Sequence, residues 1–190
     1  MIEDVLKDVA RVWQGVISQE KFRALHQGEV KSSDIIAQVR NSVLGENYET
    51  AELAIGAGEL LRLFKQNEDF ITPIEMLFSA GKYSDYSQLI RMLEQIHSEK
   101  TLPLLVKIVK GDYQYESDLN LPLNIARQAL YAIAKLNTGK ALEILHHLSQ
   151  NLDETIARIA LEVYRETQDE DWNIYIQSLE KKRTHENRDE

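Results

Sequence analysis

The sequence predicts an all-α protein built from stacked copies of one helical unit, and three observations carry this prediction. Apolar residues recur at spacings of three and four along nearly every segment, which is the period of an amphipathic helix. No stretch alternates cleanly enough between apolar and polar residues to predict a β-strand. Residues 125–130 (IARQAL) and 156–161 (IARIAL) share five of six letters at a separation of 31 residues. A recurrence of this length is typical of repeat proteins, whose stacked units mostly provide binding surface rather than a catalytic pocket.

The chain has 190 residues and can bury roughly 70% of the surface that its unfolded form exposes, which is enough for one continuous core. We therefore expect a single elongated helical domain over residues 1–182. Within it we expect capping helices over residues 1–45, degenerate repeats over residues 46–100 and clearer repeats over residues 101–182. Residues 183–190 contain no apolar side chain, and we expect this tail to be disordered.

The first 45 residues predict three helices. Over residues 2–16 one apolar stripe follows about four helical turns. Ser18 is a suitable N-cap for a short second helix. Ser32 or Ser33 begins the third helix, and Gly45 ends it.

A fourth helix is predicted over residues 48–65, although it contains Gly56 and Gly58. Each glycine inside a helix costs about 1 kcal/mol relative to alanine, so some interaction must offset that cost. The close approach of a neighbouring helix is the simplest explanation. A kink or the approach of a ligand is the alternative.

Three further helices lead to the middle of the chain. Pro73 suits the first turn of a helix that ends at Gly81, because a proline there loses no hydrogen bond. An amphipathic helix follows over residues 84–96, with Ser84 ahead of its first turn. Pro103 opens the next helix, which stops at Gly111.

The longest irregular stretch covers residues 112–121. After it the periodicity predicts helices over about residues 122–136, 139–149, 153–167 and 171–182.

The helix over residues 122–136 is apolar around most of its circumference. Its apolar residues span about 200° of a helical wheel, so we expect neighbours on two sides. These residues are Ile125, Ala126, Ala129, Leu130, Ala132, Ile133, Ala134 and Leu136. Arg127 lies at the edge of this arc, and Arg158 takes the same place one repeat later. In the following helices, Leu142, Ile144, Leu145 and Leu148 are matched about 32 residues later by Ile174, Tyr175 and Leu179.

Residues 101–180 resemble the HEAT-repeat family, in particular its short variety. Its units carry an aspartate in the turn, followed by a valine–arginine pair and a run of small residues. In the later repeat Asp153, Ala157, Arg158 and Ala160 fit this pattern.

The earlier repeat fits the same pattern less completely. Ala126, Arg127 and Ala129 occupy the expected places, but Asn120 or Asn124 stands where the turn aspartate is expected.

The resemblance implies a right-handed α-solenoid of antiparallel helix pairs, with about nine or ten helices in this chain. It implies binding to other proteins and no catalytic residue. It also assigns Arg127, Asp153 and Arg158 structural roles, in which each arginine bonds the turn of the neighbouring repeat.

We find no pattern typical of an enzyme or a metal site. His146 and His147 point about 100° apart on a helix, so both cannot easily face one metal. Glu143 and His146 form one Glu-x-x-His motif, but a di-iron bundle needs a second. The other histidines lack a serine or aspartate at a spacing typical of a catalytic triad; they are His26, His97 and His185. Without cysteines, phosphate loops or Gly-x-Ser-x-Gly, we expect a non-enzymatic protein with no cofactor and no metal.

The charge of the chain favours a basic partner. A net charge of -9 repels a phosphate backbone, which argues against nucleic acid, and attracts cationic proteins. Residues 111–179 hold 11 acids and 5 bases, and two tyrosines stand among three acids over residues 112–118. Tyrosine is typical of binding hot spots. The predicted partner-binding residues are Asp112, Tyr113, Tyr115, Glu116, Asp118, Glu154 and Asp171. A solvated acidic rim explains the same pattern equally well.

We expect a cytoplasmic monomer that does not bind membranes. No apolar run approaches the roughly 20 residues that cross a bilayer. The acidic first residues do not have the pattern of a signal peptide, and the absence of cysteine fits a reducing compartment.

The functional hypothesis is a protein-binding module whose acidic, tyrosine-bearing surface neutralises a basic protein. The most concrete form is a bacterial immunity protein that inhibits a cognate toxin such as a nuclease. The first alternative is an adaptor or assembly chaperone that holds an amphipathic helix, near the glycine-bearing helix around Ile55. Relatives with this short repeat that attach bilins give a further alternative, and HEAT-like proteins that survey damaged DNA are disfavoured by the acidic charge. Salt sensitivity separates a charge-driven complex from an apolar groove.

Overall fold

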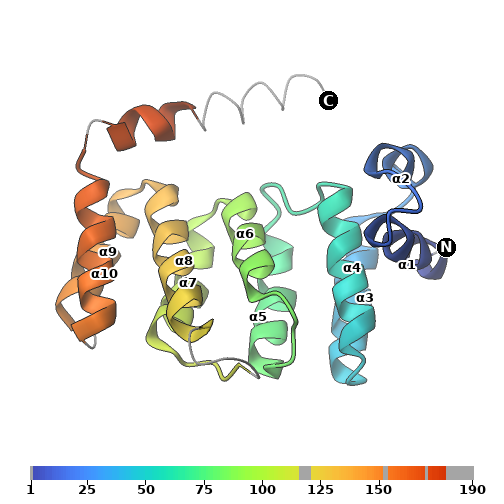
Figure 1. Ribbon diagram of the computed structural model, residues 1–190, viewed down its shortest axis with the longest axis horizontal. Helices are drawn as coiled ribbons and strands as arrows, with labels where there is room; N and C mark the ends of the chain where they lie inside the picture. Colours follow the sequence, from blue (N-terminus) through green and yellow to red (C-terminus); the bar gives the residue numbers. More distant parts are fainter. Residues whose placement is uncertain (1, 116–120, 152–153, 170, 179–190) are drawn as a thin grey trace. The chain divides into compact units, whose positions relative to one another are not determined.

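The computed structural model describes residues 2–115, 121–151, 154–169 and 171–178 (Figure 1). These residues form the α-helices α1 to α10, the short 3-10 helices η1 and η2, and a further helical stretch over residues 171–178. No β-strand occurs among them. The prediction of an all-α protein is confirmed. None of the helices in these ranges is long and apolar enough to cross a membrane.

The chain divides into two compact units. The N-terminal unit consists of Met1–Leu104 and Tyr113–Asp118, and the C-terminal unit of Leu105–Asp112 and Leu119–Glu190. The division falls close to the predicted change from degenerate to clearer repeats. The single domain over residues 1–182 stays a prediction.

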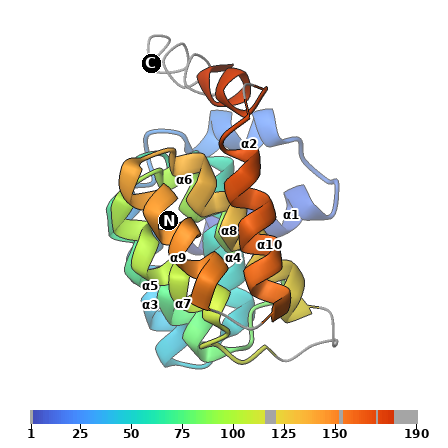
Figure 2. The same cartoon turned by 90° about the vertical axis from the view of Figure 1, so that its left-hand side faces the viewer.

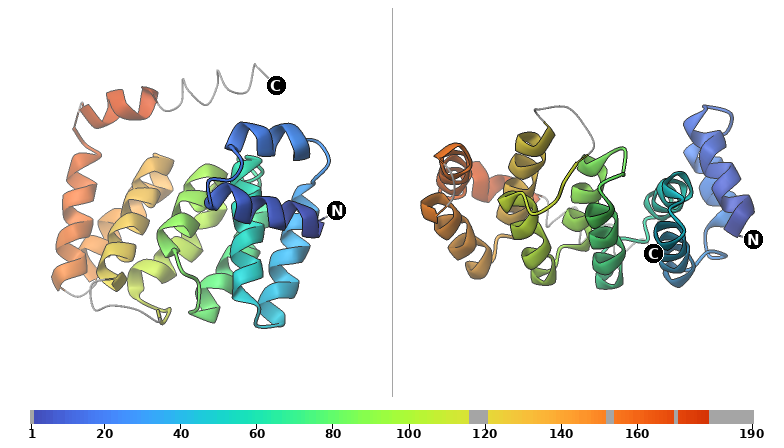
Figure 3. Two further views of the ribbon diagram at one scale, coloured as in Figure 1. Left: turned by 45° about the vertical axis from the view of Figure 1, so that its right-hand side comes forward. Right: turned by 90° about the horizontal axis from the view of Figure 1, so that it is seen from below.

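In the N-terminal unit, helices pack against one another without a sheet. Helix α1 lies against α2 and α4, α3 against α4 and α5, and α5 against α6 (Figures 1 and 3). The elements are α1 (Ile2–Trp13), α2 (Gln19–His26), α3 (Ser32–Leu44), α4 (Tyr48–Leu60), η1 (Glu68–Phe70), α5 (Ile71–Ala80), α6 (Tyr86–Ile96) and η2 (Glu99–Thr101).

Short polar side chains cap the N-termini of α2 and α6, and the sequence predicted one of these two caps. The Ser18 hydroxyl accepts a hydrogen bond from the backbone N–H of Lys21 at 3.2 Å, so the predicted cap of α2 is confirmed. Helix α6 is capped by Asp85 rather than Ser84, because the Asp85 carboxylate accepts from the Gln88 N–H at 3.0 Å. Ser84 instead uses its own N–H to bind Glu52 on α4 at 2.7 Å.

Large apolar side chains from most of these helices form the core of the N-terminal unit. Burial of one such side chain stabilises the fold by about 1.5–3 kcal/mol. The largest fully buried side chains include Phe22, Ile35, Ile55, Phe64, Phe70, Ile74, Leu77, Phe78, Leu89 and Ile90.

The two glycines of α4 are sites of close packing. A Cβ on Gly56 would lie 2.6 Å from Cζ2 of Trp13, which comes from α1. A Cβ on Gly58 would lie 2.8 Å from Cε2 of Phe64. The close approach of a neighbouring helix is therefore the correct explanation for Gly56, whereas Gly58 is crowded mainly by Phe64, which follows the same helix. Helix α4 also ends at Leu60, five residues before the predicted end at Lys65.

In the C-terminal unit, α9 lies against both α8 and α10, and α8 lies against α10 (Figure 2). Helix α8 spans Leu121–Leu136, α9 spans Gly139–Asn151 and α10 spans Glu154–Glu166. All eight residues of the predicted apolar arc on α8 are buried, which confirms that this helix is covered on more than one side. Helix α7 (Leu102–Lys110) contributes residues to both units.

The predicted match between the second helices of the two repeats is found at one position and not at two others. Leu145 on α9 is buried, and so is Ile176, 31 residues later. Ile174 and Tyr175 are 58% and 43% exposed, whereas Leu142 and Ile144, with which they were matched, are half-buried. Leu179, the match of Leu148, lies outside the described residues. The buried residue of the stretch over 171–178 is Ile176. A helix that turns Ile176 inward places Ile174, about 200° away, on the outside.

Candidate functional site

The two tyrosines of the predicted binding loop pack within the N-terminal unit. The ring of Tyr113 lies 5.4 Å from that of Phe78, and the ring of Tyr115 lies 4.6 Å from that of Tyr86. Both tyrosines are half-buried. The structure therefore places them as anchors of their own loop, and their contact with a partner stays a prediction.

The hydroxyl of Tyr115 is buried without a hydrogen-bond partner in the described part of the chain. Burial raises the pKa of this phenol above its usual value. An unsatisfied buried hydroxyl costs about 1–3 kcal/mol, and the packing of the Tyr115 ring on Tyr86 must offset this cost.

Gly81 lets the same loop approach the end of α5. It ends the helix in the left-handed conformation with φ of 70°, which favours glycine. A Cβ at this position would lie 2.8 Å from the carbonyl oxygen of Gln114. Both the turn and the close contact require glycine.

Of the five predicted acidic residues the structure describes Asp112, Glu154 and Asp171. Asp112 is exposed and belongs to the C-terminal unit, where its N–H donates to the Lys107 carbonyl at 3.1 Å. Glu116 and Asp118 lie outside the described residues. Glu154 and Asp171 are exposed, but they flank opposite ends of α10. A helix of 13 residues is roughly 20 Å long, so these two carboxylates are not neighbours.

Exposed carboxylates are spread along α10 and the residues that follow it. They belong to Glu154, Glu162, Glu166, Asp169 and Asp171. Glu162 forms a pair with Arg158 at 3.7 Å, and Glu166 accepts from the Tyr131 hydroxyl at 3.2 Å. Exposed pairs of this kind contribute about 0–1 kcal/mol, so the carboxylates are available to an external cation at little cost.

The two repeat arginines have related surroundings. Arg158 pairs with Glu162, four residues later. Burial of the Tyr131 phenol raises its pKa, and Arg127, four residues before it, acts on that pKa in the opposite direction. Tyr131 and Glu162 are themselves 31 residues apart, so each arginine meets the equivalent position of its own helix. Asp153, the predicted turn partner, lies outside the described residues.

His146, the first of the two histidines on α9, is exposed and contacts its neighbours on the surface. Nε2 of His146 lies 3.1 Å from the Gln150 side-chain nitrogen, and its ring lies 5.2 Å from that of Tyr164. No group of three metal-ligating side chains occurs among the described residues.

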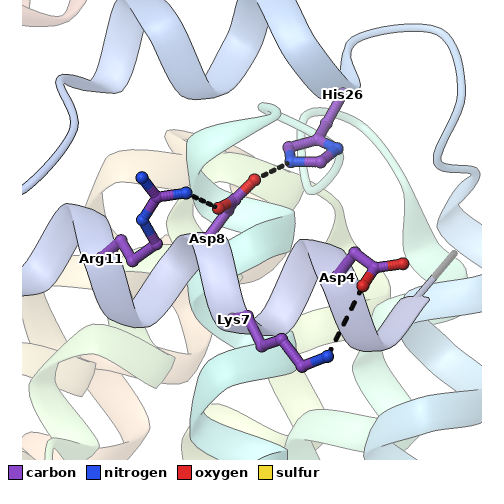
Figure 4. A network of polar contacts seen from close by, with 5 residues as sticks. All are labelled: Asp4, Lys7, Asp8, Arg11 and His26. Carbon is purple, nitrogen blue, oxygen red and sulfur yellow. Dashed lines mark hydrogen bonds and ion pairs between the residues drawn. The ribbon is translucent and has the colours of Figure 1, made fainter.

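His26, for which the sequence indicated no catalytic partner, is part of a polar network with α1 (Figure 4). Its Nε2 lies 3.0 Å from Oδ2 of Asp8, and Arg11 donates to Oδ1 of the same carboxylate at 2.8 Å. The hydrogen bond from His26 is the main reason that the pKa of Asp8 lies below its usual value. The His26 ring also packs on Phe22, with centroids 4.8 Å apart. The network joins α1 to α2.

A second network joins α4 to α6, and no sequence pattern predicted it. The Tyr83 hydroxyl donates to the Gln88 side chain at 2.7 Å, and Gln88 donates to Glu59 at 2.6 Å. Burial, and next the nearby charge of Glu52, raise the pKa of Tyr83. These hydrogen bonds connect the Glu59 side chain of α4 with the Gln88 side chain of α6.

The structure also contains an open groove between α3, α4 and α5, which we call the α3–α5 groove. Its volume is about 480 Å³. It is lined by Val43, Tyr48, Thr72, Glu75, Met76, Ser79 and Ala80. Its lining includes Tyr48, which stands between Glu46 and Glu49 in the sequence. The lining residues come from three helices, so the groove could not be predicted without knowing how these helices pack together.

No protein-family model matches the chain, and neither a curated protein nor a solved structure is significantly similar to it.

Proposed function

We propose that the chain is a helical repeat protein of the cytoplasm that binds a basic protein through its acidic surface. In this proposal the helices form a right-handed solenoid of antiparallel, HEAT-like pairs, and the protein has no catalytic activity. The best concrete form is a bacterial immunity protein that neutralises a cationic toxin, possibly a nuclease.

One observation supports this proposal more than any other: the five carboxylates along α10 and residues 169–171 are all exposed. Together with the net charge of -9, they give the C-terminal unit a surface to which a cationic protein is attracted. Opposite charges also steer partners together, which suits an inhibitor that must act quickly.

The binding residues of this proposal keep Glu154 and Asp171 from the predicted set and add Glu162, Glu166 and Asp169. Because Tyr113 and Tyr115 pack on Phe78 and Tyr86, the proposal relies on the carboxylates of α10 rather than on free tyrosine rings.

Affinity purification of the tagged protein from its own host, followed by mass spectrometry, tests the proposal. We expect a basic protein that is released at high ionic strength. Recovery of an acidic protein, or of one retained at high salt, would argue against a charge-driven complex. A basic toxin encoded in the neighbouring reading frame would support the immunity form.

For the adaptor alternative, one observation argues against the location near Ile55 and another offers a second location. The glycines near Ile55 are covered by Trp13 and Phe64, so the space directly beside them is filled. The α3–α5 groove offers a different place for an apolar segment.

A further inference from the structure

We propose that residues 113–115 form a strap that opens and closes over the aromatic pair of Phe78 and Tyr86. We call these three residues the 113–115 strap. Opening uncovers that pair and releases the rings of Tyr113 and Tyr115, which the sequence predicts to bind a partner. The closed strap is therefore an autoinhibitory contact. This inference goes beyond the proposed function, because that function relies on carboxylates of the C-terminal unit.

Ring packing holds the 113–115 strap closed. The ring of Tyr113 lies 5.4 Å from that of Phe78. The ring of Tyr115 lies 4.6 Å from that of Tyr86 and 6.5 Å from that of Phe78. Centroid distances of roughly 4.5–7 Å are typical of favourable aromatic pairs. Phe78 belongs to α5 and Tyr86 begins α6, and both are buried, so the strap closes on a surface that two helices provide.

The backbone of the 113–115 strap contributes little to the closed state. It lies outside the helices, and neither Gln114 nor Tyr115 makes a backbone hydrogen bond to another backbone group of the described residues. Gly81 gives the strap room to close, because a Cβ there would lie 2.8 Å from the carbonyl oxygen of Gln114. A segment that is held by side chains rather than by a hydrogen-bonded backbone opens at a lower free energy than a helix does.

The Tyr115 hydroxyl favours the open state. In the closed state it is buried without a hydrogen-bond partner in the described part of the chain, and this burial raises the pKa of the phenol. Water satisfies the hydroxyl once the strap opens. The Tyr113 hydroxyl differs, because it donates to Oε1 of Glu75 at 3.4 Å. Ring packing and the unsatisfied hydroxyl thus act in opposite directions within Tyr115, which keeps the open state accessible.

NMR relaxation dispersion on the full chain tests the strap, because it measures the population of a minor state that exchanges in microseconds to milliseconds. The ring Cζ signals of phenylalanine and tyrosine are the suitable probes, since a ring flip leaves them unchanged. Tyr115→Phe deletes only the unsatisfied hydroxyl, and Tyr115→Ala deletes the ring as well. Tyr113→Phe is the matched control, because it removes the same atom from the same strap where that atom has a partner. Circular dichroism verifies that each variant is folded.

We expect the rings of Phe78, Tyr86, Tyr113 and Tyr115 to report one shared exchange process in the wild type. Tyr115→Phe should lower the open population at least about fivefold, because the closed state no longer buries an unpaired hydroxyl. Tyr115→Ala should raise the open population at least about tenfold relative to Tyr115→Phe, because its ring contacts are lost. Tyr113→Phe should leave the open population unchanged or raise it, because it removes a hydrogen bond of the closed state.

Three results would overturn the inference. Absence of exchange in both the wild type and Tyr115→Ala would show that the strap does not open. Different exchange rates for Tyr113 and Tyr115 would show that the two residues move independently. An equal fall of the open population in Tyr115→Phe and Tyr113→Phe would show that the unpaired hydroxyl does not favour opening. None of these results concerns the carboxylates of α10, so the proposed function would stand.

Discussion

Asp8 offers the sharpest test of how the first two helices are joined. Its carboxylate receives hydrogen bonds from His26 and Arg11, and the side chains of Asp8 and His26 are only 16% and 11% exposed. A hydrogen bond to a charged group contributes about 1.5–3 kcal/mol when it is sheltered from water. We therefore expect Asp8→Asn to lower the free energy of unfolding by about that amount.

Urea denaturation followed by circular dichroism measures this loss. With a slope of about 2 kcal/mol per molar urea, the midpoint should fall by about 0.8–1.5 M. Asp4→Asn is the matched control, since it makes the same change on the same helix in a pair whose side chains are 70% and 72% exposed (Figure 4). Its midpoint should stay close to that of the wild type.

The pH dependence of the Asp8 effect has a definite sign. The pKa of Asp8 is lowered from 3.8, chiefly by the hydrogen bond from His26. A depressed carboxyl pKa stabilises the folded state above the unfolded pKa, and the stabilisation is lost as the pH falls through the folded pKa. The difference between wild type and Asp8→Asn should thus be complete at neutral pH and shrink below 3.8. Equal midpoints for Asp8→Asn and Asp4→Asn at neutral pH would refute this reasoning.

Three further predictions concern packing. Gly81→Ala should destabilise the fold more than Gly111→Ala. Both glycines have positive φ, but a Cβ at Gly81 would also lie 2.8 Å from a backbone carbonyl oxygen, whereas a Cβ at Gly111 would meet nothing within 4 Å. The melting temperatures of the two variants test this. Tyr115→Phe should leave the free energy of unfolding, measured by urea denaturation, unchanged or raise it by up to about 1 kcal/mol, since it deletes a buried hydroxyl without a described partner. A clear loss of stability would reveal a missed hydrogen bond. Leu130→Ala should cost about 2–5 kcal/mol in urea denaturation, whereas Ile174→Ala, at an exposed position, should cost far less; similar losses would contradict the observed burial.

Local patterns predicted the helices well. The buried arc of α8 follows from spacing alone, because an amphipathic helix exposes its polar stripe wherever it docks. The helix ends at Gly81 and Gly111 could also be predicted locally, because a turn that needs a positive φ favours glycine whatever the rest of the chain does. The orientation of residues 171–178 did not follow, because Ile174 and Ile176 offer two apolar faces and only docking selects one.

The candidate sites depended on contacts between distant residues. His26 seemed isolated because Asp8 stands 18 residues earlier, on another helix. Tyr113 and Tyr115 were expected to meet a partner, yet Phe78 and Tyr86 provide apolar surface for them within the chain. Composition predicted the acidic charge of the C-terminal unit, but composition does not predict which carboxylates share a face.

The central claim is that charge draws a basic protein to the carboxylates of α10. The association rate constant of the protein recovered by affinity purification, measured at increasing ionic strength, tests this claim most directly. The account predicts a steep fall with salt, and a flatter one for the double variant Glu162→Lys and Glu166→Lys. A rate constant that is insensitive both to salt and to this charge reversal would contradict it.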